Sequence, residues 1–306
     1  MLYCNFHRHL AAARDLAELA ILALSADEFD TGFGKIGQAI ARKLLARGFE
    51  YCFPKCLRFL VGVEAVKSQG GAAPKLVSVG GADFLDFKPR YGAGTVCLQA
   101  EIFGQACGIL GNNGPIDPQG ATKATQFLQL CDQANIPVLF MQNTTGYMVG
   151  TQSERAGMIK HGSKMIQAVR NLEVPRITLM TGASFGAGNY GMCGRGYNPD
   201  FLYTFPQARM GVMGGEQAGK TMSMVARGKA AAMGQEPDEE AIKGQEVWLA
   251  DHFDKQSSAF YTSGHLLDDG MIDPRDSRNT LGFLLQTVWE TRNRTVRPNS
   301  FGIARM

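Results

Sequence analysis

Residues 178–196 read Thr178-Leu-Met-Thr-Gly182-Ala-Ser-Phe-Gly186-Ala-Gly-Asn-Tyr-Gly191-Met-Cys-Gly-Arg-Gly196. The apolar, β-branched run from Ile177 to Thr181 predicts a buried strand. Six of the next fifteen residues, 182–196, are glycine, and we call this segment the glycine corner. Glycine lets another molecule approach the main chain, and the first N–H groups of a following helix lack partners within the helix. The pattern therefore predicts an anion site, for a phosphate or for charge that develops on an oxygen during a reaction.

Three interpretations of the glycine corner compete. The glycines can simply relieve crowding where a helix crosses a strand. Alternatively, residues 182–186 match G-x-S-x-G, the setting of a serine nucleophile, and Ser184 would then act with His265 or His252 and with Asp200 as a serine hydrolase. The third interpretation is an oxyanion hole built from backbone donors alone. The local pattern does not separate the last two.

Composition narrows the class of protein. The chain has 306 residues, 45% of them hydrophobic, and a net charge of +3. Such a near-neutral balance, without basic runs interleaved with aromatics, gives no case for nucleic-acid binding. No apolar run is long enough to span a membrane, so we expect no membrane insertion. The seven cysteines are scattered and odd in number, which favours reduced thiols in the cytoplasm, or in the mitochondrial matrix of a eukaryote. No cysteine spacing indicates a metal site.

The first 80 residues differ from the rest. They are expected to be mostly helical, and the segment Gln69–Pro74 resembles a linker, so we place a domain boundary near residue 80, with domains 1–80 and 81–306. Residues Gly32–Gly37 match the G-x-G-x-x-G turn of NAD-dependent dehydrogenases. That motif should directly follow a strand, and here polar residues intervene. Hydride transfer is therefore the last of our functional hypotheses.

After residue 80 the pattern alternates between strands and helices. Residues 95–102 and 106–110 predict a hairpin. Helices are predicted at 123–134, 158–170, 218–233 and 281–289, and strands at 137–142, 176–181 and 201–205. In the helix 158–170, Ile159 is expected on the buried face. This alternation favours an α/β fold with parallel strands and right-handed crossovers. Because ligands bind beyond the carboxyl ends of such strands, the loops 111–114, 142–150 and 182–196 are expected to share a pocket.

Several longer pieces resemble a known family. They are Phe87–Gly92, Gly111–Gly114, Gln142–Gly150, Lys160–Met165, Gly186–Arg195, Val212–Gln217 and Asp268–Pro274. Through these pieces, the sequence from about Phe84 to Met306 resembles the C-terminal half of a carboxyltransferase β subunit. The family is that of the biotin-dependent acyl-CoA carboxylases, and the type is that of methylcrotonyl-CoA carboxylase. The resemblance implies a crotonase-like spiral of ββα units. It also implies an enzyme that moves a carboxyl group from carboxybiotin to an acyl-CoA.

The resemblance also implies roles for individual residues. The backbone N–H groups of Gly186, Ala187 and Gly188 would form the oxyanion hole for the biotin ureido oxygen, so no covalent serine is needed. Four further residues would line the biotin side, namely Gly146, Tyr147, Val149 and Phe185. The implied cofactor is biotin, carried by a partner with a biotin carboxyl carrier domain and a biotin carboxylase. The chain would form a homo-oligomer or pair with a CoA-binding half.

Three departures from the family leave the substrate open. Residues 1–80 stand where the family has a CoA-binding half of the same fold. Pro115–Gln119 replaces a Phe-Ser-Glu stretch, and Thr144 replaces isoleucine. Geranyl-CoA or another branched enoyl-CoA is therefore an alternative to 3-methylcrotonyl-CoA. A second alternative is a non-catalytic half that only docks partners.

Overall fold

The computed structural model describes residues 63–66, 75–78 and 84–295. The chain divides after Tyr51 into two units, and every described residue belongs to the second. Before residue 80, strands β1 (Val63–Val66) and β2 (Lys75–Ser78) pair antiparallel in a sheet of their own. The 32–37 turn, the 69–74 linker and the last eleven residues lie outside the described residues. The domain boundary near residue 80 therefore stays a prediction.

The main sheet is mixed, with the order β3-β4-β5-β6-β7-β8 and with β9 on the end of β7. Strands β3, β4 and β5 are antiparallel, and β5 to β8 are parallel, as is β9 to β7. The strands are β3 (Phe84–Asp86), β4 (Thr95–Ile102), β5 (Gln105–Asn112), β6 (Val138–Thr144), β7 (Arg176–Phe185), β8 (Phe201–Thr204) and β9 (Arg209–Gly211). The predicted hairpin is confirmed: β4 and β5 are joined by Phe103 and Gly104, both with positive φ, as a type I′ turn requires.

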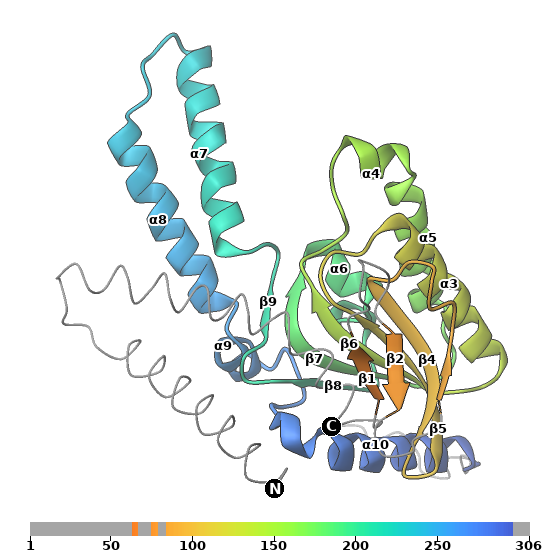
Figure 1. Ribbon diagram of the computed structural model, residues 1–306. Coiled ribbons are helices and arrows are strands. Elements are labelled where there is room, and N and C mark those ends of the chain that lie inside the picture. The colour runs from red at the N-terminus through yellow and green to blue at the C-terminus, as the bar shows by residue number, and fades with distance from the viewer. Residues whose placement is uncertain (1–62, 67–74, 79–83, 296–306) are drawn as a thin grey trace, which may run out of the picture. The chain divides into compact units, whose positions relative to one another are not determined.

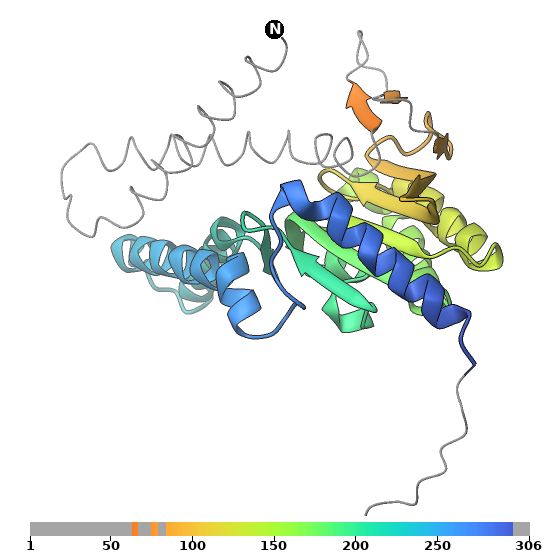
Figure 2. The same cartoon turned by 90° about the horizontal axis from the view of Figure 1, so that it is seen from below.

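Helices cover both faces of this sheet. Helices α3 and α5 pack on one face, and α10 lies across the other (Figures 1 and 2). The helices are α3 (Pro118–Gln133), α4 (Thr151–Arg155), α5 (Met158–Arg170), α6 (Gly186–Gly191), α7 (Gly215–Ala232), α8 (Glu239–Gln256), α9 (Ala259–Gly264) and α10 (Ser277–Arg292), with 3-10 turns at Arg195–Tyr197 and Pro274–Asp276. This layered order of strands and crossover helices is the predicted α/β architecture.

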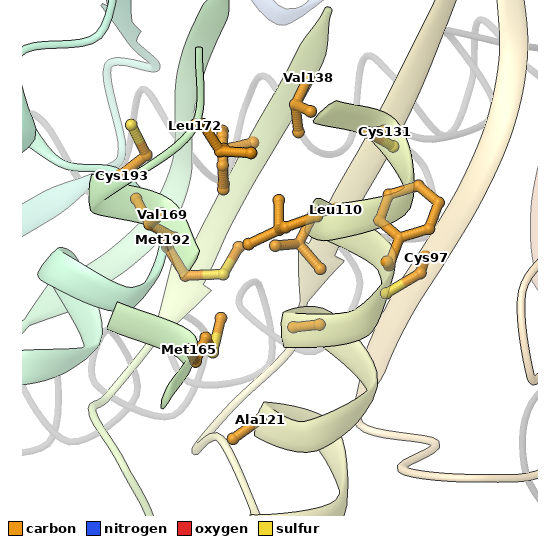
Figure 3. Close-up of a cluster of buried hydrophobic side chains, with 14 of the residues drawn as sticks. Cys97, Leu110, Ala121, Cys131, Val138, Met165, Val169, Leu172, Met192 and Cys193 are labelled. Atoms are coloured by element: carbon orange, nitrogen blue, oxygen red, sulfur yellow. The ribbon is translucent and has the colours of Figure 1, made fainter. Parts of the chain in front are cut away.

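Two buried clusters hold the layers together. One joins α10 to the sheet. The other lies under α3 and α5, and Figure 3 shows side chains of both helices meeting strand residues such as Leu110 and Val138. Met192 and Cys193, which follow α6, point into the same cluster and are fully buried. The end of the short helix α6 is thereby anchored in the core.

Three predictions of detail were wrong. Helix α3 begins at Pro118 instead of residue 123, because Asp117 caps it by accepting a hydrogen bond from Gly120 N at 2.6 Å. Ile159, which we placed on the buried face of α5, is 76% exposed. Strand β7 continues four residues past Thr181 to Phe185, because residues 183–185 pair with β9. The third difference changes the interpretation of the glycine corner.

Helices α7 and α8 form a helical hairpin that projects from the sheet (Figure 1). They approach closely at Gly215 and Gly219, where an added Cβ would lie 2.3 Å from Ala250 O and 2.7 Å from Glu246 O, respectively.

No described helix is long and apolar enough to cross a membrane. Among the described residues, no group of three or more acidic, histidine or cysteine side chains is placed to hold a metal ion.

Candidate functional site

The three predicted loops meet, and Asn143 at the end of β6 joins them. Its side-chain Nδ2 donates to Asn113 Oδ1 at 2.6 Å, and its Oδ1 accepts from Ala183 N at 3.0 Å. Its carbonyl oxygen accepts from Gly114 N at 2.8 Å. One asparagine therefore holds the ends of three neighbouring strands in register, which confirms that the loops 111–114, 142–150 and 182–196 converge.

The glycine corner bends sharply between β7 and α6. Gly186 has φ +54°, a conformation that suits glycine and few other residues, and the helix starts there. The N–H groups of Gly186, Ala187 and Gly188 occupy the first turn, where a helix offers no acceptor of its own. No side chain caps this turn. Ala187 is exposed and Gly186 half-buried, so a ligand can reach this end of α6.

Gly188 and Gly146 bring two of the loops into close contact. A Cβ on Gly188 would lie 2.8 Å from Gly146 Cα and 2.9 Å from Thr144 Cγ2. Gly146 has φ +125°, and Thr144 Oγ1 accepts a hydrogen bond from its N–H at 3.1 Å. The loop that follows β6 is thus folded directly against the first turn of α6. Gly188 leaves no room for a side chain, whereas Gly146 is required by its positive φ.

Ser184 is not placed as a nucleophile. A nucleophile elbow sets the serine on the turn with its hydroxyl exposed, whereas Ser184 lies inside β7 and is fully buried. Its Oγ donates to Gln142 Oε1 at 2.5 Å and accepts from Asn189 Nδ2 at 2.7 Å. Cys193 is no substitute, because burial raises the pKa of its thiol to about 12.

The proposed partners of Ser184 are engaged elsewhere. Asp200 Oδ2 accepts from Arg176 N, His265 Nδ1 is hydrogen-bonded to Tyr261 O, and the His252 ring stacks on Trp248. In the part of the chain that the structure describes, no histidine is hydrogen-bonded to Ser184. The serine hydrolase interpretation was therefore wrong.

The residues expected on the biotin side are buried to different degrees. Tyr147 is partly buried, and its hydroxyl donates to Gly162 O at 3.4 Å. Burial raises the pKa of this phenol well above its usual range, so it is neutral at physiological pH. Phe185 lies over Gly211 of β9. Val149 is 85% exposed and would contact a ligand only at the rim.

Charge around the corner favours an anion. The loops 111–114, 142–150 and 182–196 contain no aspartate or glutamate, and their one charged residue is Arg195. Its guanidinium pairs with Asp269 at 3.3 Å. With no carboxylate in these loops to compete, the partial positive charge of the first helical turn is available to a ligand oxygen.

Two features were missed at the level of sequence. The first is a set of amide side chains behind the corner, the buried Gln142 and Asn143 and the half-buried Asn189. The signal for Gln142 and Asn143 was polar residues at the end of an apolar strand. The second is a hollow of about 500 Å³ beside the 142–150 loop, lined by residues that include Asp117, Met148 and His161. It brings together three separate helices, so periodicity alone gives no sign of it.

Comparison with known proteins agrees with this architecture. A family model described as a carboxyl transferase domain matches residues 65–301. The mitochondrial β chain of methylcrotonoyl-CoA carboxylase from Arabidopsis thaliana is 44% identical over 231 residues, 74% of this chain and 38% of that protein. A probable biotin-dependent acyl-coenzyme A carboxylase β2 subunit from Mycobacterium tuberculosis is 47% identical over 230 residues, 74% of this chain and 43% of that protein.

Solved structures give the same result. The β subunit of geranyl-CoA carboxylase from P. aeruginosa is 54% identical, with a TM-score of 0.68 over 73% of this chain and 42% of that one. The 12S subunit of a transcarboxylase is 26% identical, with a TM-score of 0.60 over 72% of this chain and 42% of that one. The chain spans about two fifths of the length of these relatives. Its fold is the crotonase-like carboxyltransferase fold, and the chain belongs to the carboxyl transferase domain family.

Proposed function

We propose that this chain is the carboxyltransferase half of a biotin-dependent acyl-CoA carboxylase and moves a carboxyl group from carboxybiotin to an acyl-CoA. Family membership supports the reaction class. The observation that carries the proposal is the glycine corner itself. It presents an uncapped first helical turn in loops without carboxylates. An oxygen that gains negative charge during the reaction would be stabilised there.

Each residue of the corner has a distinct task in this proposal. Carboxybiotin, when bound, supplies the carboxyl group and leaves negative charge on its ureido oxygen. The N–H groups of Gly186, Ala187 and Gly188 donate hydrogen bonds to that oxygen. Beside them, Gly146, with φ +125°, lets the biotin rings approach the backbone, while Phe185 and Val149 bound the site.

Tyr147 adds to this environment through its protonation state. Because burial raises its pKa, the phenol stays neutral and places no negative charge next to the departing ureido group. The deletion of a single oxyanion donor costs about 10²–10³ in rate in enzymes generally. Three backbone donors at one oxygen would therefore contribute strongly to the rate.

The acyl-CoA side requires more than the described residues. The relatives are more than twice as long as the matched region, and we infer that a second polypeptide segment completes the CoA site. The biotin comes on a partner with a carrier domain and a biotin carboxylase, and the assembly is a homo-oligomer or a pair of unlike halves. Relatives are named for methylcrotonoyl-CoA and geranyl-CoA, so we propose a branched enoyl-CoA, 3-methylcrotonyl-CoA first.

Burial of the thiols supports the proposed compartment. The described cysteines 97, 107, 131 and 193 are buried and free. Free thiols of this kind fit the reducing cytoplasm, or the mitochondrial matrix of a eukaryote.

A transfer assay tests the proposal. The chain is purified from its native host with the proteins that accompany it, and is given carrier-bound carboxybiotin labelled with ¹⁴C in the carboxyl group. With 3-methylcrotonyl-CoA or geranyl-CoA added, we expect the label to move to an acid-stable carboxyacyl-CoA. The same preparation without acyl-CoA is the control, and it should form no labelled carboxyacyl-CoA.

Two outcomes would overturn the proposal. Label that stays on the carrier, in a preparation that contains both biotinylated protein and a CoA-binding half, would indicate a chain that only docks partners. Stoichiometric labelling by a fluorophosphonate probe that is lost in Ser184→Ala would restore the hydrolase interpretation, against the burial of that hydroxyl.

A further inference from the structure

We propose that Gln142, Ser184 and Asn189 are positioning residues that aim the first-turn amides of α6. This inference rests on the proposed function, since it assigns a task to side chains behind the oxyanion site. None of the three is expected to touch the ligand. Gln142 and Ser184 are fully buried and Asn189 is half-buried.

The three side chains form one directed chain of hydrogen bonds. Asn189 Nδ2 donates to Ser184 Oγ at 2.7 Å, and Ser184 Oγ donates to Gln142 Oε1 at 2.5 Å. Gln142 Nε2 then donates to Met192 O at 2.6 Å. The carbonyl oxygen of Met192 only accepts, so it fixes which end of the Gln142 amide faces the serine. Every donor in the chain therefore has a single arrangement.

This chain links α6 to two strands. Gln142 lies in β6 and Ser184 in β7, while Asn189 lies in α6 and Met192 directly after it. A helix of six residues is far too short to be stable by itself. Its orientation must come from what holds it, and here the strands hold it at Asn189, its fourth residue, and at Met192, just past its C-terminal end. Since Asn189 follows Gly188 directly, its bond to β7 fixes the rotation of α6 about its own axis, and with it the direction of the N–H groups at 186–188.

The surroundings leave this chain little freedom. A Cβ on Gly194 would lie 1.9 Å from Asn189 Oδ1, so the Asn189 amide fills the space that a side chain at 194 would need. Gly194 N donates to Asn189 O at 2.8 Å, and Thr178 Oγ1 donates to Cys193 O at 2.7 Å. The Met192 and Cys193 side chains are embedded in the core beneath (Figure 3).

The hydrogen-bond chain of Gln142, Ser184 and Asn189 contains no group that titrates near neutral pH, which suits a positioning task. It keeps its arrangement across the physiological range and adds no charge behind the anion. A purely structural role would make the same contacts. The difference lies in what is lost on mutation: stability alone, or the rate of the step in which charge develops. Misplacement of a catalytic group by about 1 Å can cost about 10²-fold in rate.

A double-mutant cycle tests this in the complete complex. The variants are Ser184→Ala, Asn189→Ala and the double mutant. The control is Ser223→Ala, a buried serine of α7 that donates to Glu246 Oε2 at 2.6 Å, away from the corner. For each we measure the melting temperature, kcat for carboxyl transfer, and KM for the acyl-CoA. Gly194→Ala, which pushes the Asn189 amide aside instead of deleting it, is an independent fifth variant.

We expect both single mutants to lower kcat by about 10- to 100-fold, with the KM for acyl-CoA unchanged. The double mutant should be little worse than either single, because both remove the same bond. Gly194→Ala should behave as Asn189→Ala does. Ser223→Ala should lower the melting temperature by a few degrees, as Ser184→Ala does, while leaving kcat as in the wild type.

The inference is overturned if Ser184→Ala and Ser223→Ala have the same kcat. It is also overturned if the fold-loss in kcat of the double mutant equals the product of the losses in Ser184→Ala and Asn189→Ala. A wild-type complex without transfer activity would instead count against the proposed function. The positioning claim is then tested on the free chain by amide NMR. It predicts that the ¹⁵N–¹H resonances of residues 186–188 shift in Ser184→Ala and not in Ser223→Ala, and unchanged resonances in both would refute it.

Discussion

Two corners of this protein share one sequence device and differ in chemistry. At the glycine corner, β7 leads through Gly186 into α6. At what we call the second corner, residues 211–217, β9 leads through Gly214 into α7. Gly186 has φ +54°, whereas Gly214 has an ordinary φ of −66°. Helix α6 has six residues and its first turn is free of acids, while α7 has eighteen and carries Glu216 there.

The difference explains why we propose an anion site at only one of the two corners. Both helices begin with N–H groups that lack partners within the helix. At the second corner Glu216 already offsets the partial positive charge of α7, and it pairs with Lys220 at 2.6 Å. Among the described residues of the glycine corner, no acidic side chain lies in the first turn of α6 and none caps it. In our proposal, Gln142, Ser184 and Asn189 fix the helix from behind. We therefore infer that charge in the first turn and rigidity behind it decide whether such a corner can bind an anion, and that glycine content alone does not.

The largest effect is expected for Gly188→Ala. The new Cβ would lie 2.8 Å from Gly146 Cα, a backbone atom that can move only if the backbone of its loop shifts. The first turn of α6 must shift, and we expect carboxyl transfer to fall by about 10²-fold or more. The matched control is Gly214→Ala at the second corner, where an added Cβ meets nothing within 4 Å.

Transfer rates of the two variants, measured on protein of verified fold by circular dichroism, check this. Equal loss in both would mean that the glycine corner has no special role. Full activity in Gly188→Ala would mean that the close contact between the two loops is not needed for carboxyl transfer.

The second prediction concerns the packing of the helical hairpin. Gly215→Ala would place a Cβ 2.3 Å from Ala250 O, so α7 and α8 must separate. We expect a loss of about 1–3 kcal/mol in the free energy of unfolding, measured by urea titration. The amide NMR chemical-shift changes that biotin causes at residues 186–188 should be the same as in the wild type. Gly228→Ala in the same helix meets no atom and should stabilise it slightly. If Gly215→Ala abolished biotin binding, the two corners would not be independent.

The third prediction is a pH dependence from Tyr147. Burial raises its pKa in the folded state, so the unfolded chain releases this proton first as pH rises through about 10. Stability is thus fully present below pH 10 and falls above it, by at most about 1.4 kcal/mol per pH unit from this group. Urea titrations at pH 8, 10 and 11 should show a steeper loss in the wild type than in Tyr147→Phe. Parallel losses would mean that Tyr147 ionises normally.

The smallest effect is expected for Glu216→Gln. The side chain and its Lys220 partner are largely exposed, so the pair contributes little, and the lost helix-dipole contact costs about 0.3–1 kcal/mol. The melting temperature at low salt measures this, and the difference should shrink in 1 M NaCl. Carboxyl transfer should be unchanged, and a tenfold loss would show that the second corner also takes part in the reaction.

Much of this fold follows from sequence because periodicity reports which side of an element is buried. Helix α5 was predicted with its observed bounds, and the β4–β5 hairpin follows from two short apolar runs around Phe103 and Gly104. The convergence of three loops follows from the rule for parallel strands. The error at β7 has a physical cause: pairing with β9, a contact between distant segments, extends the strand past Thr181.

The convergence of the three loops was predicted from sequence, but the side chains that support the glycine corner were not. The glycines of the corner were visible because they cluster, and the family resemblance selected residues 186–188. The Gln142–Ser184–Asn189 chain was not predicted, because G-x-S-x-G describes both an exposed nucleophile and a buried hydroxyl. Which of the two it is depends on where the strand ends, and that is set by tertiary pairing.

A crystal structure of the chain with biotin tests the central claim most directly. The account predicts the ureido oxygen within hydrogen-bonding distance, about 2.7–3.2 Å, of at least two of the amide nitrogens of Gly186, Ala187 and Gly188, with no carboxylate nearby. Biotin bound elsewhere, with these amides facing solvent or another part of the protein, would contradict it.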